Sequence, residues 1–240
     1  MKPLKVDLHI HTKEDKEDRI SYSAYQLIDE AELRGFDALA ITNHDTLTYS
    51  PELKSYAAAR GIVLIPGVEA VIRDKHVLLV NMPFENGAYN SFGDVLMQKA
   101  GNNLVIAPHP YFPGPTSLNG HLEAMPQLFD AIEHCHFYTR WIDFNRPAIR
   151  FARKHQLPVV GTSDAHVLEQ FGLTYSLVEA KKTPDAIIQA IKAGRVKPVS
   201  RPLSLAQLIR TFVCVAGTKR PLELPCIGAA FIKDVLDRRP

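Results

Sequence analysis

Short apolar runs of strand length alternate along this chain with segments that carry the period of an α-helix, and this alternation constrains the fold most. Strands are predicted at residues 4–10, 38–42, 63–68, 76–80, 104–107, 131–136 and 158–161, with 173–178 as an eighth candidate. Helices are predicted at residues 24–34, 51–60, 92–100, 146–155 and 184–193. Several strands are continuous Val/Ile/Leu runs, as expected in a parallel sheet buried on both faces. About seven repeats of this kind predict an α/β fold and favour a closed or nearly closed barrel over an open sheet.

The chain is expected to form one barrel domain over residues 1–200. A loop rich in Pro and Gly at residues 108–120 carries no apolar period and is expected to fold over one end of the barrel. The pattern then changes, and residues 201–240 are predicted to be a C-terminal helical appendage packed on the same domain. Its two helices are expected at residues 203–216 and 227–236.

Composition excludes several classes of protein. A hydrophobic content of 46% with a formal charge of +2 is typical of a folded globular chain, which excludes disorder as the main state. The near-neutral charge does not favour long nucleic acid as a partner. Three cysteines cannot form a disulfide framework, and no run is long and apolar enough for a signal peptide or a membrane span. We therefore expect a soluble, cytoplasmic protein; its oligomeric state is left open.

Side chains that can bind metal ions stand at the ends of nearly all the predicted strands. Two of them, His9 and His11, are two residues apart and so point to the same face of the first strand. In a parallel barrel the carboxyl ends of all strands meet at one mouth, where active sites are built. The eight residues expected to converge there are His9, His11, His44, Glu69, His76, His109, Asp164 and His166.

So many imidazoles and carboxylates in one cavity require counter-ions, because desolvated polar and charged groups need partners. Histidine and carboxylate ligands suit Zn²⁺, Mn²⁺ or Fe, and no cysteine is among them. Eight ligands exceed the needs of one ion, so the sequence predicts two or three divalent metal ions.

The motifs DLHIHT, ITNHDT, GVE, KHVLLV, APHP and TSDAH, in this order, resemble those of the PHP (polymerase and histidinol phosphatase) family of metal-dependent phosphoesterases. The resemblance covers about residues 4–200. It implies a distorted (β/α)7 barrel of parallel strands, a metal site of two or three ions at the C-terminal mouth, and hydrolysis of phosphate esters.

The resemblance also implies how the ligands are shared among the ions. The first ion would be held by His9, His11, Glu69 and Asp164. The second would be held by Glu69, His76 and His109, with Glu69 bridging the two ions. The third would be held by His44, His166 and one residue from the loop after the first strand.

That last ligand is where the sequence departs from the family pattern. Many relatives read Ser-Asp-Gly there, whereas this chain has a longer charged loop at residues 13–19. Asp18 is the first choice because it directly precedes the lead-in to the helix, and Asp15 is the second choice. A solvated run of charges explains most of the loop.

Other residues have expected roles around the metals. Asp7 lies two residues before His9, so the two side chains point to the same face of the strand. It is expected either to orient a ligand imidazole or to form a salt bridge at the strand end. His136 falls where the family usually carries Asn and is expected to face the substrate. Arg146 is expected to bind phosphate, with a solvated arginine at a helix start as the alternative.

The chemistry expected from these residues is attack on phosphorus by a metal-activated hydroxide, with Glu69 and Asp164 as the catalytic carboxylates. The substrate would be a small phosphomonoester, a nucleotide or the end of an oligonucleotide. Two alternatives are a metal-bound PHP module with a structural or binding role and a metal-dependent amidohydrolase. The second lacks support because the chain offers no metal-bridging lysine on the fourth strand.

Overall fold

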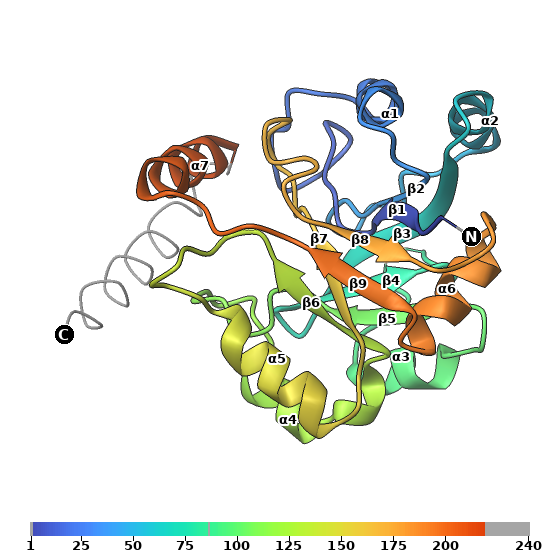
Figure 1. The fold of residues 1–240 in the computed structure, drawn as a ribbon. Coiled ribbons are helices and arrows are strands. Elements are labelled where there is room, and N and C mark those ends of the chain that lie inside the picture. Colours follow the sequence, from blue (N-terminus) through green and yellow to red (C-terminus); the bar gives the residue numbers. More distant parts are fainter. Residues whose placement is uncertain (1, 86, 219–240) are drawn as a thin grey trace.

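The computed structural model describes residues 2–85 and 87–218, which fold into one nearly closed barrel of strands with helices packed around it (Figure 1). The nine strands are β1 (Leu4–Asp7), β2 (Ala38–Ile41), β3 (Val63–Ile72), β4 (Lys75–Val80), β5 (Leu104–Ala107), β6 (Ala131–Cys135), β7 (Val159–Thr162), β8 (Tyr175–Val178) and β9 (Val196–Val199). The predicted α/β barrel is therefore confirmed, with nine strands where seven or eight were expected. The strand missed by the sequence, β9, contains Pro198, which is tolerated because β9 lies last in the strand order and pairs only with β8.

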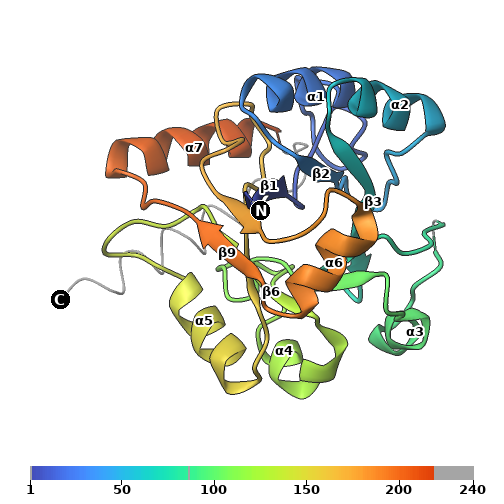
Figure 2. The same ribbon diagram turned by 45° about the vertical axis from the view of Figure 1, so that its right-hand side comes forward.

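The helices are α1 (Ala24–Leu33), α2 (Pro51–Ala59), α3 (Phe92–Gln98), α4 (Gly120–Ala124), α5 (Asn145–Lys154), α6 (Pro184–Lys192) and α7 (Leu205–Thr218), with a short 3-10 helix at Pro126–Leu128. All the predicted helices within the described residues are present to within two residues at each end, whereas α4 and the short 3-10 helix were not predicted. Side chains of Ser23, Ser50 and Thr183 accept hydrogen bonds from main-chain N–H groups of the first turn, which fixes the starts of α1, α2 and α6. Figure 2 shows α1 and α2 side by side on one flank of the barrel and α4 and α5 on the opposite flank.

The sheet is mixed, whereas the sequence predicted parallel strands throughout. Its order is β7-β6-β5-β4-β3-β2-β1-β8-β9. Two parallel groups, β1–β3 and β5–β7, are joined by β4, which is antiparallel to both neighbours. A tight turn at Arg73 and Asp74, both with positive φ, connects β3 directly to β4 as a hairpin. Because β4 runs backwards, its first residues, including His76, lie at the same mouth as the ends of the parallel strands.

The ring is closed by contacts between β7 and the β1–β8 side. The main-chain N–H of Gly161 donates to Ser176 Oγ, and this hydroxyl donates to the Gly161 carbonyl, both at 2.9 Å. Beyond the strand ends, Asp164 N–H donates to the His9 carbonyl at 2.9 Å and His11 N–H to the Ala165 carbonyl at 3.1 Å. The closing contacts thus run through the segments that carry the predicted ligands.

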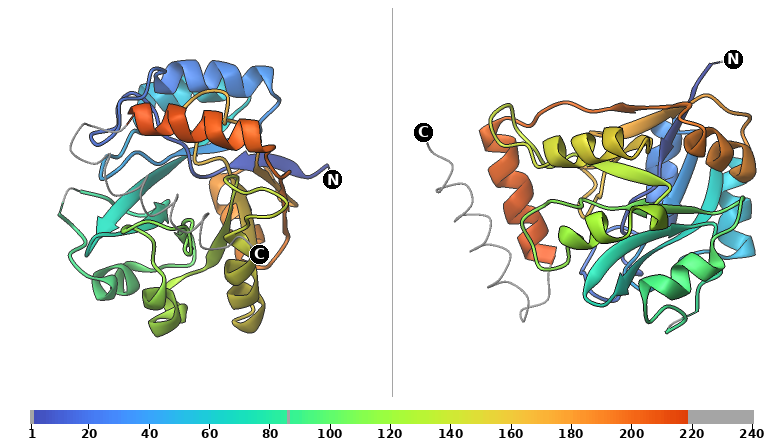
Figure 3. Two further views of the ribbon diagram at one scale, coloured as in Figure 1. Left: turned by 90° about the vertical axis from the view of Figure 1, so that its left-hand side faces the viewer. Right: turned by 90° about the horizontal axis from the view of Figure 1, so that it is seen from below.

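The helix α7 lies along one side of the barrel (Figure 3). Leu203 and Leu208 are buried with Phe137 and Phe144, which follow β6. The predicted helix at 203–216 is therefore present, while the one at 227–236 lies outside the described residues, and the division of the chain at residue 200 stays a prediction. Within residues 2–85 and 87–218, no helix combines the length and the apolar character needed to cross a bilayer.

Barrel closure gives the first testable prediction. A Cβ added at Gly161 would lie 2.6 Å from the Tyr175 carbonyl oxygen, a main-chain atom of β8 that cannot move without opening the sheet. We expect Gly161→Ala to lower the free energy of unfolding by about 1–3 kcal/mol in urea denaturation. Gly101→Ala is the control, because its added Cβ meets only the Gln189 amide at 4.0 Å. Equal stability of the two variants would contradict this account of closure.

Candidate metal centre

Glu69 lies at the centre of the predicted ligand cluster. Its side chain is buried, and its Oε2 atom lies 3.1 Å from His9 Nε2, 3.1 Å from His11 Nε2 and 3.3 Å from His44 Nε2. The strands explain this meeting: His9 and His11 follow β1, and a main-chain bridge pairs His44, after β2, with Glu69 of β3. Three imidazole nitrogens therefore converge on one carboxylate oxygen.

The second oxygen of the same carboxylate faces a different pair of histidines. Glu69 Oε1 lies 2.6 Å from His76 Nδ1 and 3.2 Å from His109 Nε2. His76 comes from the start of the antiparallel strand β4, and His109 follows β5. Each oxygen of Glu69 thus has its own set of imidazoles, which is the arrangement expected of a carboxylate that bridges two ions.

Asp164 completes the side of the cluster near His9. Its Oδ1 atom is 3.3 Å from His9 Nε2 and 3.4 Å from His11 Nε2. Asp164 has a φ of 45°, an uncommon conformation for a residue other than glycine. This backbone turn follows β7 at the point where the chain pairs with the end of β1.

Carboxylates behind the histidines fix which ring nitrogen faces the centre. His9 Nδ1 lies 2.7 Å from Glu133 Oε1, and Asp15 Oδ2 lies 2.9 Å from His11 Nδ1 and 3.0 Å from His44 Nδ1. An ionised carboxylate only accepts hydrogen bonds, so each Nδ1 carries a proton. The Nε2 atoms, which carry the lone pairs in the neutral rings, then point at Glu69, and this is the usual geometry of metal-binding histidines.

Glu133 was not predicted from the sequence. It is fully buried in β6, and its other oxygen accepts the main-chain N–H of His109. A lone acidic residue inside the apolar run that begins at Ala131 was the available signal. Glu133, and not Asp7, contacts the His9 ring, since Asp7 Oδ1 accepts main-chain N–H groups of His9 and Ser163 at 3.3 and 3.1 Å. Neither of the two alternatives for Asp7, an orienting contact or a salt bridge at the strand end, appears in these bonds.

The two aspartates considered for the third ion have different surroundings. Asp18 Oδ2 lies 2.9 Å from His166 Nε2, while Asp15 holds histidines from behind. His166 Nδ1 lies 3.0 Å from the Asp164 carbonyl, which can only accept, so its Nε2 carries the lone pair of the neutral ring. The Nε2 lone pair of His166 and the carboxylate of Asp18 are both electron donors, so a cation between them would bind both. Asp18 as the ligand stays a prediction, and the geometry favours it over Asp15.

The charges of the cluster shift the protonation of its members in the metal-free protein. Burial by itself would lower the pKa of His9 and His11, but the surrounding carboxylates outweigh it and raise both pKa values well above the usual range. Burial would raise the pKa of Glu69, but His76, His9 and His44 hold it well below its usual range. At His44 burial dominates and lowers the pKa to about 4. Protons thus partly supply the positive charge that this donor set requires.

The donor set fits divalent metal ions. Three groups of ligand atoms lie within 4.8 Å of one another: His9 with Glu69 and His109, His9 with His11 and Asp164, and His11 with His44 and Glu69. The second group is part of the set expected for the first ion. The third group differs from the prediction, since it joins His44 to Glu69 and not to His166.

The two predicted substrate residues are placed differently. His136 is buried at the end of β6, and burial lowers its pKa to about 4. The Arg146 side chain is 64% exposed at the start of α5, and its Nε lies 3.6 Å from Asp143 Oδ2. The structure therefore brings His136, but not Arg146, into the buried part of the mouth, and both roles stay predictions.

Comparison with known proteins supports the resemblance seen in the motifs. Residues 143–196 match a family model described as PHP-associated. The fold is similar to that of a two-domain protein from Bacteroides vulgatus, described as containing a predicted PHP-like metal-dependent phosphoesterase. The TM-score is 0.65 at 21% identity, covering 89% of this chain and 70% of that one.

Two further structures share the fold. PsfC from Pseudomonas syringae has a TM-score of 0.62 at 21% identity, covering 89% of this chain and 98% of that chain. A lesion-specific endonuclease from Pyrococcus furiosus has a TM-score of 0.58 at 20% identity, covering 81% and 57%. No curated protein sequence matches the chain. At these identities the likeness establishes a shared PHP-like fold, and this confirms the α/β barrel implied by the motifs, though with a mixed sheet of nine strands instead of seven parallel ones.

The role of Glu133 can be tested through metal affinity. Replacing Glu133 with Gln should weaken zinc binding about 10–100-fold, because an amide has one accepting oxygen, whereas the carboxylate accepts both the His9 Nδ1–H and the His109 main-chain N–H. The measurement is competition with a chromogenic chelator. Asp130→Asn is the matched control. Asp130 is a mostly buried acid that directly precedes β6, at the end of the strand away from the mouth, and it pairs with Lys99. Equal affinity in both variants would exclude an orienting role for Glu133.

The raised pKa values of His9 and His11 predict the pH dependence of metal uptake. Both rings carry an extra proton near neutral pH without metal, and this proton must leave for Nε2 to bind an ion. Apparent zinc affinity should therefore rise with pH through the neutral range and fall on acidification. Calorimetry in buffers of different ionisation enthalpy should register proton release, and a heat independent of buffer would contradict the prediction.

Proposed function

We propose that this chain is a metal-dependent phosphoesterase that hydrolyses a phosphomonoester or a nucleotide phosphate. The observation that carries the proposal is the position of Glu69, whose two oxygens each face separate histidines at 2.6–3.3 Å. A buried carboxylate shared in this way suits adjacent divalent ions, and paired ions are the common solution for phosphoryl hydrolysis. The position of this cluster at the mouth of a PHP-like barrel supports the proposal.

The proposed ligands follow from the geometry and the motifs together. His9, His11, Asp164 and Glu69 would hold one ion, and Glu69, His76 and His109 a second. A third would lie between Asp18 and His166, completing a trinuclear centre. His44 would serve the ion next to Glu69 Oε2, or the third ion as the motifs imply. Zinc, manganese or iron suits this donor set.

When bound, such ions lower the pKa of a coordinated water and neutralise charge on the phosphate group. The protein's contribution is to hold the donors in place and to exclude other nucleophiles. Ser163 Oγ lies 3.5 Å from the His9 carbonyl and Ser117 Oγ 3.3 Å from the His109 carbonyl. The Ser163 hydroxyl also hydrogen-bonds the buried Asp7 carboxyl. Neither hydroxyl contacts a histidine in these bonds, so they do not favour a covalent serine intermediate activated by an imidazole.

The proposed class of substrate rests on two side chains near the mouth, on the net charge and on the shared fold. His136 would contact a phosphorylated substrate from the end of β6, and Arg146 would have to reorient from Asp143 to bind phosphate. The net charge of +2 favours a small substrate over long nucleic acid, whereas the fold shared with a lesion-specific endonuclease makes an oligonucleotide the class to compare with it. A substrate screen should therefore pair nucleotides and sugar phosphates with short oligonucleotides.

The bridging role of Glu69 gives the main test. Purified protein loaded with Mn²⁺ or Zn²⁺ should hydrolyse a generic aryl phosphate, and a chelator should abolish this activity. Glu69→Gln should lower kcat by at least about 100-fold, because the amide cannot neutralise two ions. Asp130→Asn, which removes a carboxylate outside the mouth, should leave kcat within about twofold. Full activity of Glu69→Gln would overturn the proposed bridge.

The competing proposal is a metal-bound module without catalysis. It predicts the same metal stoichiometry in the wild-type protein, but no phosphate release from any member of the screen. Metal content and phosphate release measured on one preparation therefore separate the two functions.

A further inference from the structure

Gln170 is a buried polar residue outside the proposed ligand set, and its side chain joins two parts of the mouth. It lies in the loop between β7 and β8 and is 2% exposed. Its Oε1 atom accepts main-chain N–H groups of His166 at 2.8 Å and of Val167 at 2.9 Å. Its Nε2 atom lies 3.0 Å from His136 Nε2. One amide therefore links the chain segment of a predicted metal ligand to a buried histidine.

The orientation of this amide is fixed by elementary chemistry. Main-chain N–H groups only donate, so the atom that faces those of His166 and Val167 must be the oxygen of Gln170. The NH₂ group must then face His136. Because an amide nitrogen only donates, His136 Nε2 must accept, and the ring proton must sit on Nδ1.

This tautomer leaves one donor unsatisfied. His136 Nδ1 is buried and has no hydrogen-bond partner among the described residues. A buried N–H without an acceptor costs free energy, so such groups in folded proteins usually await a water or a ligand. The ring also lies near enough to Asp164, Glu133 and His166 to be affected by their charges.

We propose that Gln170 is a positioning residue that holds the main chain at His166 and presents the Nδ1–H of His136 to an oxygen of the phosphorylated substrate. The contact with the substrate rests on the proposed phosphoesterase function. The tautomer of His136 and the support of the main chain at His166 do not depend on that function. A neutral donor at this position would bind a phosphate oxygen without adding positive charge beside the metal ions. Gln170 thereby connects recognition of the substrate to the loop that closes the barrel.

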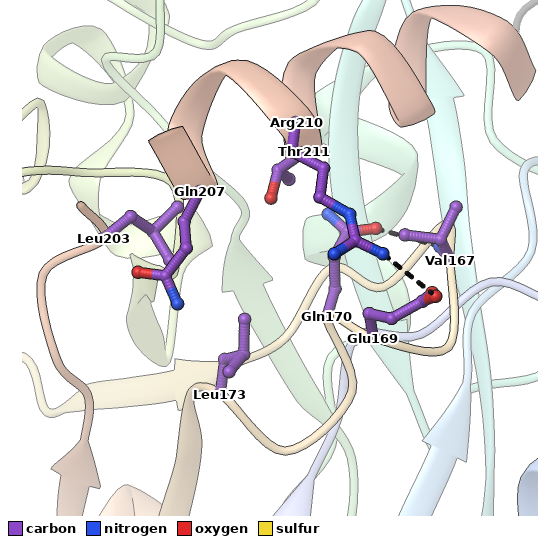
Figure 4. A pocket seen from close by; sticks show the side chains of 8 residues that line it. All are labelled: Val167, Glu169, Gln170, Leu173, Leu203, Gln207, Arg210 and Thr211. Carbon is purple, nitrogen blue, oxygen red and sulfur yellow. Dashed lines mark hydrogen bonds and ion pairs between the residues drawn. The ribbon is translucent and has the colours of Figure 1, made fainter. Parts of the chain in front are cut away.

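The surroundings of Gln170 offer a matched control. The residue lines a cavity of about 130 Å³ between its loop and α7, together with Leu203, Gln207 and Arg210 (Figure 4). The Gln207 side chain accepts the main-chain N–H of Ser204 at 2.9 Å, a local bond at the start of α7. Gln207→Glu thus introduces the same charge into the same cavity while retaining that acceptor.

The first experiment reads the tautomer directly, with no need for turnover. Full-length, zinc-loaded protein labelled with ¹⁵N is examined by long-range ¹H–¹⁵N correlation of the histidine rings, and His136 is assigned by its loss in His136→Gln. We expect a protonated Nδ1 and an unprotonated Nε2. A proton on Nε2 in the wild-type protein would overturn the proposal. Addition of inorganic phosphate should shift the Nδ1 resonance, and no shift at millimolar phosphate would overturn the donor role.

The second experiment separates the two contacts of Gln170. Gln170→Glu keeps an acceptor for the N–H groups of His166 and Val167 but replaces the donor, so it should move the His136 proton to Nε2 and leave zinc content unchanged. Its kcat/KM for an aryl phosphate should fall about tenfold or more. Gln170→Leu removes both contacts and should also lower the zinc content, while Gln207→Glu should change none of these readouts.

The outcomes distinguish this inference from the proposed function. An unchanged tautomer in Gln170→Glu, or wild-type zinc content and tautomer in Gln170→Leu, would overturn the positioning role. Absence of hydrolysis in the wild-type protein, with the expected tautomer and zinc results, would instead overturn the phosphoesterase proposal and leave the positioning role in place.

Discussion

The convergence of histidine ring nitrogens on the buried carboxylate of Glu69 is the constraint on which the site depends. Imidazole nitrogens within 3.3 Å of both of its oxygens cannot be held by side-chain packing alone, because each ring rotates about two bonds. Glu133 and Asp15 remove that freedom by accepting hydrogen bonds from the far side of the rings. The centre is therefore built in two layers, and the outer layer decides which nitrogen faces inward.

The mixed sheet explains how one mouth can collect ligands from strands of opposite direction. In an all-parallel barrel only strand ends contribute to the mouth. The hairpin at Arg73 and Asp74 turns β4 around, so that His76, at its start, reaches Glu69, six residues from the start of β3. A parallel strand in this position would have carried its first residue to the opposite end of the barrel.

The sequence predicts which side chains converge at the mouth far better than it predicts their surroundings. The spacing of His9 and His11 is enough to place both rings on one face, and strand ends in an α/β chain identify His44, His109 and Asp164. The orientation of each histidine ring depends instead on which side chain of a distant strand lies behind it. Glu133, which lies behind His9, is 124 positions away from it in the chain. No local pattern contains that information, which is also why an orienting role was one of two alternatives for Asp7 while Glu133 was not considered.

The reversal of β4 and the presence of β9 were missed for a different reason. Apolar periodicity indicates that a strand is buried but not its direction, and the short connection at Arg73–Asp74 was the only sign of a hairpin. The segment Val196–Val199 carries a lysine and a proline and so lacks the continuous apolar run by which the other strands were found. Edge strands of this kind are specified by their partner, here β8, more than by their own composition.

Closure of the barrel and assembly of the centre are one structural event. The hydrogen bonds from Asp164 N–H to the His9 carbonyl and from His11 N–H to the Ala165 carbonyl join residues that are themselves predicted ligands or their neighbours. A cation held between His9, His11 and Asp164 would therefore pull together the two segments whose pairing closes the ring. By mass action, ions that bind only the folded state would stabilise the closed barrel over any state in which the segments that follow β7 and β1 have separated. The charges gathered around Glu69, costly in isolation, would then strengthen the fold at its seam.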